Sequence, residues 1–177
     1  TDPVPSDPAF LEWQELTASA DVATGAMVAL APSAADAARL AVEGGEPMDQ
    51  LHVTLAYLGD ADVYSDNARE SIVERLESHP FTAPIGADAF SVNVFNPGTA
   101  TDRDPCIVLG LSGGDLAHAY GWVNQALEYE MEHKAPPNHE PWIPHVTLAY
   151  TDDMTRVAEF VDRVGPVTFD HLVVAFA

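Results

Sequence analysis

The chain has 177 residues, 47% of them hydrophobic, enough to bury a substantial interior in one domain or in two small lobes that share a core. It carries 28 acidic against 7 basic residues, a net charge of −21, and so offers few of the Lys and Arg side chains that tight binding to long RNA or DNA requires. No stretch reaches the roughly 20 apolar residues of a membrane-spanning helix, and no signal peptide is visible.

Two interpretations of the acidity stay open. Either the ligand is a small nucleotide or short oligonucleotide, if it is a phosphate at all, or the surface is adapted to high salt. The lone Cys106 lies in an apolar run, without a CxxC motif, and is expected to be a buried hydrophobe. Residues 1–20 are expected to be a flexible lead-in to a single domain over 21–177. Because the chain does not begin with Met, we expect a trimmed start or a domain cut from a longer protein.

The first half of the chain alternates between strand and helix signals. A short apolar run ended by Pro32 predicts a strand, and Ser33 is a good N-cap for the Ala-rich helix that Gly44 stops. A stretch rich in β-branched and aromatic residues follows, and then apolar residues at helical spacing. The expected elements are a strand at 26–31, a helix at 33–43, a strand at 51–58 and a helix at 66–78.

The second half repeats this order. Its longest amphipathic pattern predicts one helix over 115–132, while prolines exclude regular structure from the loops 96–105 and 133–141. The other expected elements are strands at 87–95, 106–111 and 142–150, a helix at 154–164 and one or two strands over 166–177. The chain therefore contains two copies of one strand–helix unit, which predicts an α+β or α/β protein with an internal pseudo-twofold.

The six residues HVTLAY occur twice, at His52–Tyr57 and His145–Tyr150. Strict alternation along a strand predicts that His52, Thr54 and Ala56 share one face, with Val53, Leu55 and Tyr57 on the other, and likewise in the second copy. If the two units pack about a twofold axis, two imidazoles and two hydroxyls converge. One neutral and one protonated His can act as base and acid in phosphodiester cleavage, and Thr hydroxyls can bind phosphate oxygens, without a metal.

With these two motifs the chain resembles the 2H phosphoesterase superfamily, which includes RNA 2′,3′-cyclic phosphodiesterases and 2′–5′ RNA ligase-like proteins. The resemblance rests on the two His-x-Thr motifs, on the phrases LHVTLAYLG and PWIPHVTLAY, and on the apolar opening strand followed by Pro and a helix, and it covers residues 26–177. It implies a bilobal α+β fold of two pseudo-twofold-related antiparallel sheets, with outer helices and a central cleft that holds the active site.

Carried over to this sequence, the resemblance implies that His52 and His145 are the acid–base pair and that Thr54 and Thr147 hold the phosphate, with no cofactor. It favours His145 as the base in hydrolysis, without deciding the roles. The implied substrate is a cyclic phosphate or a short 2′–5′ or 3′–5′ linked nucleotide, including cyclic oligonucleotide signals, rather than long RNA. The phrasing is similar to that of proteins encoded by phages of actinobacteria. The expected location is the cytoplasm, that of the host for a phage protein, with no membrane partner.

The alternatives are a non-catalytic nucleotide-binding module and a structural domain of a larger, phage-derived protein. A metal site built from His139, Glu140 and His145 is a rival chemistry, disfavoured by irregular spacing and intervening prolines. Alternation predicts that Tyr57 and Tyr150 pack in the core, and Trp142 is also expected there. Tyr64 is expected in a surface loop, with base stacking as the alternative. The remaining histidines are expected to be solvated or structural: His79, His118, His133, His139 and His171.

Overall fold

The fold was analysed in a computed structural model that describes residues 12–14, 25–78, 84–98 and 104–176. Its elements follow the predicted order. The strands are β1 (Glu12–Gln14), β2 (Ala26–Pro32), β3 (Val53–Gly59), β4 (Ile85–Phe95), β5 (Cys106–Ser112), β6 (His145–Tyr150) and β7 (Gly165–Phe176). The helices are α1 (Ala34–Leu40), α2 (Asp66–Glu77), α3 (Gly114–Ala126) and α4 (Glu128–His133), with 3₁₀ segments η1 (Met48–Gln50), η2 (Ala61–Val63) and η3 (Met154–Arg163).

A single hydrogen-bonded sheet in the order β3-β2-β7-β4-β5-β6 organises the molecule. All neighbours along this order pair antiparallel, while β1 pairs with β7 in parallel. The order reads as two equivalent triplets, β3-β2-β7 and β6-β5-β4, joined where β4 meets β7. The predicted pair of pseudo-twofold-related antiparallel sheets is thus present as two halves of one continuous ladder. We call β3, β2 and β7 the first half and β6, β5 and β4 the second half.

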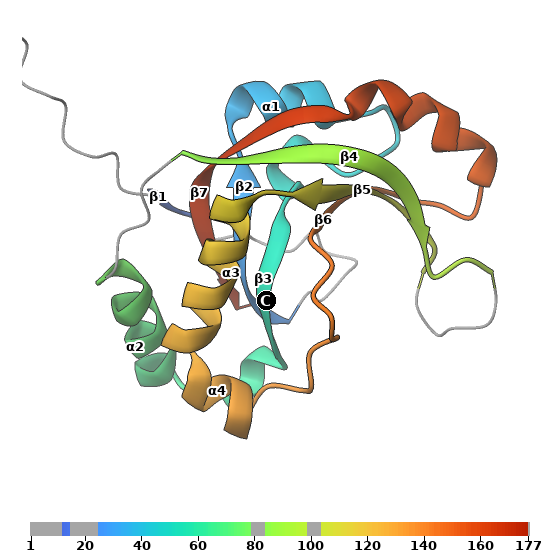
Figure 1. Ribbon diagram of the computed structural model, residues 1–177. Coiled ribbons are helices and arrows are strands. Elements are labelled where there is room, and N and C mark those ends of the chain that lie inside the picture. Colours follow the sequence, from blue (N-terminus) through green and yellow to red (C-terminus); the bar gives the residue numbers. More distant parts are fainter. Residues whose placement is uncertain (1–11, 15–24, 79–83, 99–103, 177) are drawn as a thin grey trace, which may run out of the picture.

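The two edge strands of this sheet carry the repeated sequence and approach each other. β3 and β6 are at opposite ends of the strand order, yet they are in contact with one another. Figure 1 shows that both begin near the middle of the molecule and then run apart. The curvature of the sheet therefore brings together the starts of the two HVTLAY copies, which are far apart in the sequence.

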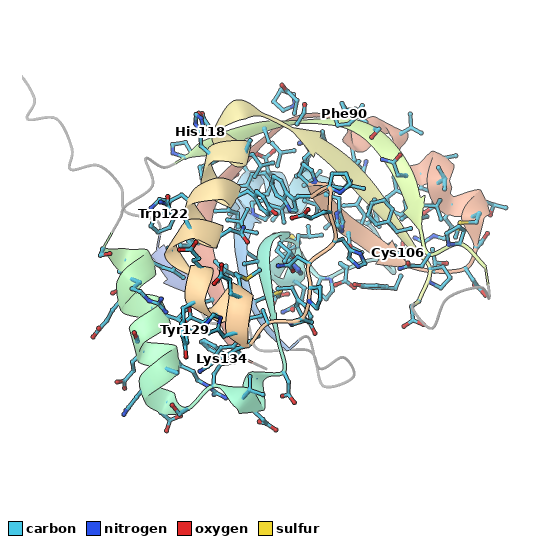
Figure 2. The ribbon with its side chains drawn as sticks, turned by 60° about the horizontal axis from the view of Figure 1, so that its bottom comes forward. Phe90, Cys106, His118, Trp122, Tyr129 and Lys134 are labelled. Atoms are coloured by element: carbon cyan, nitrogen blue, oxygen red, sulfur yellow. The ribbon has the colours of Figure 1, made fainter. Side chains whose placement is uncertain are left out.

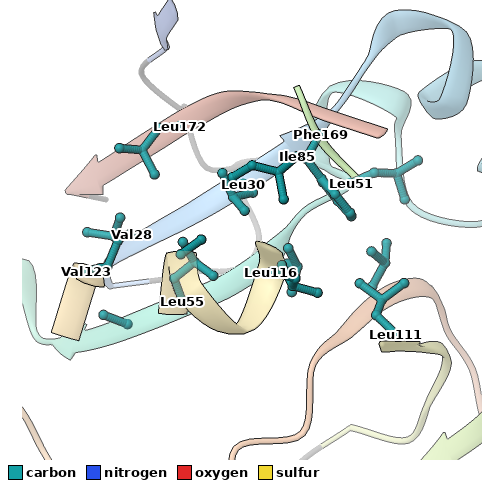
Figure 3. Packing of buried hydrophobic residues seen from close by; sticks show 14 of the residues in the cluster. Val28, Leu30, Leu51, Leu55, Ile85, Leu111, Leu116, Val123, Phe169 and Leu172 are labelled. Carbon is teal, nitrogen blue, oxygen red and sulfur yellow. The ribbon is translucent and has the colours of Figure 1, made fainter. Parts of the chain in front are cut away.

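The helices cover the sheet in two groups (Figure 1). Helix α3 packs on β3 and β4 and contacts α2 and α4, whereas α1 packs on β2 and η3 on β4. Their starts follow the local sequence: the hydroxyls of Ser33 and Ser65 accept the first backbone N–H bonds of α1 and α2, as good N-caps do. Buried side chains from β2, β3 and α3 meet in the core drawn in Figure 3, among them Val28, Leu30, Leu55, Leu116 and Val123.

Two predicted elements differ from the structure. The helix expected over 115–132 breaks at Leu127, whose backbone leaves the helical region with φ −108° and ψ 19°. At this break Arg75 of α2 donates to the carbonyl of Ala126 and pairs with the buried carboxylate of Glu130 at 2.6 Å. The strand expected over 142–150 begins only at His145. Of the lead-in expected over 1–20, Glu12–Gln14 form β1, and the rest lies outside the described residues.

Candidate functional site

His52 stands immediately before β3 and is held by the chain that leads into it. Its ring nitrogen Nδ1 lies 2.7 Å from the carbonyl oxygen of Gln50, at the end of η1. A carbonyl oxygen only accepts hydrogen bonds, so Nδ1 must carry the proton in this contact. The neutral ring then has its lone pair on Nε2, which leaves that atom able to accept a proton from a ligand.

His145 repeats this arrangement in the second half. It is the first residue of β6, and its Nδ1 lies 2.7 Å from the carbonyl oxygen of Ile143, again two residues earlier. The same argument assigns the proton to Nδ1 and the lone pair to Nε2. The His145 ring also meets Phe95, from the end of β4, edge to face with ring centroids 4.7 Å apart. No signal in the sequence around Phe95 pointed to this contact, because β4 and β6 are brought together only through β5.

Burial lowers the pKa of both imidazoles, and His145 also acts on His52. Burial lowers the pKa of His52, the bond to the Gln50 carbonyl opposes this shift, and the charge of His145 lowers the pKa further. Burial also lowers the pKa of His145, opposed by the bond to the Ile143 carbonyl. The charge of His145 is thus one of the causes that act on His52, while burial is the first cause for both rings.

Thr54 and Thr147 lie one alternation further along the same faces as the histidines. Both are half-buried between fully buried neighbours, Val53 with Leu55 and Val146 with Leu148. The Thr147 hydroxyl hydrogen-bonds to the side chains of Cys106 and Tyr150. Cys106 is buried as expected, and burial raises the pKa of its thiol.

Each HVTLAY strand contains a bulge at the same residue, and this overturns part of the predicted pattern. Along β3 the partner of β2 passes from Thr54 to Ala56 and skips Leu55, and along β6 the partner of β5 passes from Thr147 to Ala149 and skips Leu148. One inserted residue shifts everything beyond it to the other face. Ala56 and Ala149 are accordingly buried, at 2% and 0% exposure.

The prediction that Tyr57 and Tyr150 pack in the core is therefore wrong. The two residues are 42% and 54% exposed. The bulge places each tyrosine on the face of the histidine and threonine that precede it, so the aromatic rings join the candidate site. Strict alternation could not reveal this, because a period of two fails at an inserted residue.

Each bulge is stabilised by a hydrogen bond from a residue outside the sheet. In the first half the side-chain amide of Asn124, on α3, donates to the carbonyl of the skipped Leu55 at 3.0 Å. In the second half the backbone N–H of Glu46, in the loop after α1, donates to the carbonyl of the skipped Leu148 at 2.8 Å. Because a buried carbonyl needs a partner, these donors make both bulges built features of the fold.

Trp142 links the two repeats directly. Its indole N–H donates to the carbonyl of Thr54 at 3.2 Å, and its ring stacks on Tyr120 of α3 with centroids 4.0 Å apart. The side chain is half-buried against the core, in keeping with its predicted packing. Tyr64, expected in a surface loop, is instead 2% exposed and donates to the carbonyl of Leu58, since η2 folds it under β3.

The other described histidines lie on other elements or in loops. His118 is exposed on α3 (Figure 2), His133 contacts the ring of Tyr129, and His171 bonds to the carboxylate of Asp170. His139 lies in the loop before β6, and His79 is outside the described residues. Within the part of the chain that the structure describes, no group of three or more His, Cys, Asp or Glu side chains is arranged to hold a metal ion.

The basic side chains that the structure describes are engaged within the protein. The five arginines among them bond to backbone carbonyls or carboxylates: Arg39, Arg69, Arg75, Arg156 and Arg163. The ammonium group of Lys134 lies over the ring of Tyr64, 5.2 Å from its centroid. None of the helices in the described residues is both long and apolar enough to cross a membrane.

Comparison with known proteins agrees with this architecture. The family model described as the 2′-5′ RNA ligase superfamily matches residues 28–175, which include both HVTLAY copies. Among solved structures, the chain is similar to the crystal structure of the protein TT0787 of Thermus thermophilus, with 20% sequence identity and a TM-score of 0.56. That match covers 84% of this chain and 82% of the other, and at this identity it speaks for the fold alone. The search of curated proteins found no match.

Proposed function

The chain belongs to the 2′-5′ RNA ligase superfamily, the 2H phosphoesterases, and from that premise we propose that it is a metal-independent phosphodiesterase. Membership places it among enzymes of phosphoesterase or ligase type. The proposed substrate is a cyclic phosphate or a short 2′–5′ or 3′–5′ linked nucleotide, bound by Thr54 and Thr147 and cleaved by His52 and His145.

The observation that carries this proposal is the duplicated histidine anchor. Each imidazole has its Nδ1 fixed 2.7 Å from a backbone carbonyl two residues earlier, which leaves each Nε2 free to exchange a proton. Two such rings, of which His145 acts on the pKa of His52, can hold one proton between them. A base and an acid are then present at once, as cleavage of a phosphodiester requires.

In the proposed reaction His52 is the base and His145 the acid. His52 Nε2 takes a proton from water as the water oxygen bonds to phosphorus. His145 Nε2 gives its proton to the departing ribose oxygen as the phosphorus–oxygen bond breaks, and a phosphomonoester remains. The resemblance favours the opposite roles, and we assign the base to His52 because burial and then the charge of His145 lower its pKa.

The two threonines supply the phosphate contacts in this proposal. Their hydroxyls can donate to the two non-bridging oxygens, one from each half. The arginines and Lys134 of the described residues are engaged elsewhere, so the negative charge is balanced by protonated His145 rather than by a basic cluster. This supports a substrate with a single reacting phosphate over a long nucleic acid.

The test is hydrolysis of 2′,3′-cyclic mononucleotides, 2′–5′ and 3′–5′ dinucleotides and cyclic oligonucleotides, with EDTA and without added metal. We expect His52→Ala and His145→Ala to lower kcat/KM by about 10²-fold or more, since an acid or base contributes about 10²–10⁴. His118→Ala, at an exposed position on α3, is the matched control and should behave as wild type. Activity that disappears with EDTA would overturn the metal-independent mechanism, and folded protein without turnover on any substrate would overturn the proposed activity.

A further inference from the structure

The repeated bulge gives the candidate site a second matched pair of side chains. Because Leu55 and Leu148 are skipped in the pairing, Tyr57 and Tyr150 each lie two pairing steps beyond Thr54 and Thr147. Two steps along a strand correspond to about 7 Å. Each half therefore presents a histidine, a threonine and a tyrosine in a row on one face.

The hydroxyl end of each tyrosine lies near the start of the neighbouring strand. The Tyr57 hydroxyl lies 3.1 Å from the position that a Gly25 Cβ would take, just before β2. The Tyr150 side chain hydrogen-bonds to that of Thr147, and Cys106, the first residue of β5, lies close enough to help raise the pKa of Tyr150. Burial of this end raises the pKa of Tyr150, so that its phenol stays protonated at neutral pH.

The rings themselves remain open to solvent. Exposure of 42% and 54% is high for two tyrosines whose neighbours Ala56 and Ala149 are buried completely or nearly so. An aromatic face that is accessible while its tip is held in place loses little conformational freedom when a flat ligand stacks on it. Nucleobases are such ligands, and stacking on an aromatic side chain tolerates any base.

We propose that Tyr57 and Tyr150 are specificity-determining residues that each stack one nucleobase, and that the preferred substrate is a phosphodiester joining two nucleosides. This inference rests on the proposed function and narrows its substrate class. The phosphate of such a diester lies between two nucleosides, and in each half the tyrosine follows the histidine and the threonine along one strand. Tyr57 and Tyr150 belong to β3 and β6, two strands that run apart from their starts (Figure 1).

A 2′,3′-cyclic mononucleotide would engage only one of the two tyrosines. It has one base, so the ring in the other half would stay unoccupied. The His and Thr residues could act on either a cyclic mononucleotide or a two-nucleoside diester. The pair of tyrosines favours the two-nucleoside diester.

The experiment compares a diadenosine phosphodiester with adenosine 2′,3′-cyclic phosphate on Tyr57→Ala and Tyr150→Ala. Stacking on an aromatic side chain corresponds to about a 5- to 150-fold change in affinity per base. We expect each variant to raise KM for the two-base substrate by that factor with a smaller change in kcat. For the one-base substrate, only one of the two substitutions should raise KM.

Three controls separate stacking from other roles. Tyr57→Phe and Tyr150→Phe keep the ring and should lose less affinity than the alanine variants. Tyr129→Ala removes a tyrosine of similar exposure that lies on α4 rather than on β3 or β6 (Figure 2), and should leave the KM of both substrates unaffected. Thermal unfolding of each variant checks that the fold is intact.

The outcomes distinguish this inference from the proposed function. If wild type cleaves the two-base substrate but both alanine variants keep its KM, the tyrosine inference is wrong and the phosphodiesterase proposal stands. If wild type cleaves neither substrate, the catalytic proposal fails, and the Kd of the diadenosine diester can be titrated directly on wild type and both variants. Unchanged Kd values in that titration, or equal losses for one-base and two-base ligands, would also overturn the inference.

Discussion

The two halves of the molecule present the same six residues through the same bulged strand, but their surroundings differ. The first half places His52 in a setting where burial and the charge of His145 both lower its pKa. The second half places His145 against the ring of Phe95, and its Thr147 is bonded to Cys106 and Tyr150. A duplicated strand thus becomes an unequal pair through the residues around it, and an unequal pair is what acid–base chemistry needs.

The largest expected effect is on the division of labour between the histidines. With ribose as leaving group, His52→Ala and His145→Ala should each cost about 10²- to 10⁴-fold in kcat/KM. With a 4-nitrophenyl ester, whose leaving group departs without a proton, His145→Ala should recover most of its activity and His52→Ala should not. Steady-state kinetics on both substrate types makes the comparison. Recovery in His52→Ala instead would exchange the two roles.

A smaller loss is expected from the threonines, and it tests whether the halves are equal in phosphate binding. Hydrogen bonds to charged groups contribute about 1.5–3 kcal/mol, so Thr54→Val and Thr147→Val should each lower kcat/KM by about 10- to 150-fold. The measurement is kcat/KM under EDTA, with unfolding checked in parallel. If only one variant loses activity, the phosphate is held from one half alone.

The sequence correctly predicted the two matching strands that carry the candidate histidines and threonines, but it failed for Tyr57 and Tyr150. The prediction that His and Thr share a face holds in both strands, because the bulge comes after Thr54 and Thr147. Everything beyond it is reversed, which is why Tyr57 and Tyr150 were assigned to the core. In each copy the structure buries two consecutive residues, Leu and Ala, and this break in the alternation of buried and exposed residues marks the bulge.

Tertiary contacts account for the other differences. Tyr64 looked like a loop residue because its neighbours are polar, but its hydroxyl finds the Leu58 carbonyl under β3. The helix break at Leu127 depends on Arg75, which is distant in sequence and takes the Ala126 carbonyl. A contact between residues of different elements does not change the hydrophobic periodicity of either element, so the sequence does not reveal it. The contact between Phe95 and His145 is a further example.

The pH dependence should reflect the lowered pKa of both histidines. The active form of the free enzyme is the singly protonated pair, and burial lowers the pKa of each ring from 6.5. The bell-shaped profile of kcat/KM should therefore centre below pH 6.5 and fall about tenfold per pH unit on its alkaline side, as the acid loses its proton. A profile centred well above that pH would contradict the lowered pKa values of the pair.

The two bulges should differ in their sensitivity to substitution. A side-chain amide donates to the first bulge, and a backbone N–H donates to the second. Asn124→Leu removes the donor to the Leu55 carbonyl, and an unsatisfied buried carbonyl costs about 1–3 kcal/mol of unfolding free energy. Urea unfolding measures that loss. The equivalent bond from Glu46 uses its backbone N–H, so Glu46→Gln should leave stability nearly unchanged. Equal losses in both variants would mean that the Asn124 amide does not support its bulge.

The smallest expected effect concerns Phe95. An edge-to-face aromatic pair contributes about 0.5–1.5 kcal/mol, and the ring also keeps water from His145. Phe95→Leu should raise the pKa of His145 toward its ordinary value and leave His52 less affected. Titration of both imidazoles by NMR measures this. A shift of the same size at His52 would show that Phe95 acts on the whole pair rather than on one half.

The place of β7 in the sheet has a consequence for how the protein is made. The strand that completes the first half beside β2 is the last strand of the described chain, while β4, in the middle of the sequence, completes the second half. On the ribosome β2 and β3 emerge early but lack this neighbour until residues 165–176 have been synthesised. The second half can pair β4, β5 and β6 from contiguous sequence. Folding during translation is therefore expected to start in the half that is made later, with the N-terminal strands waiting for the far end of the chain.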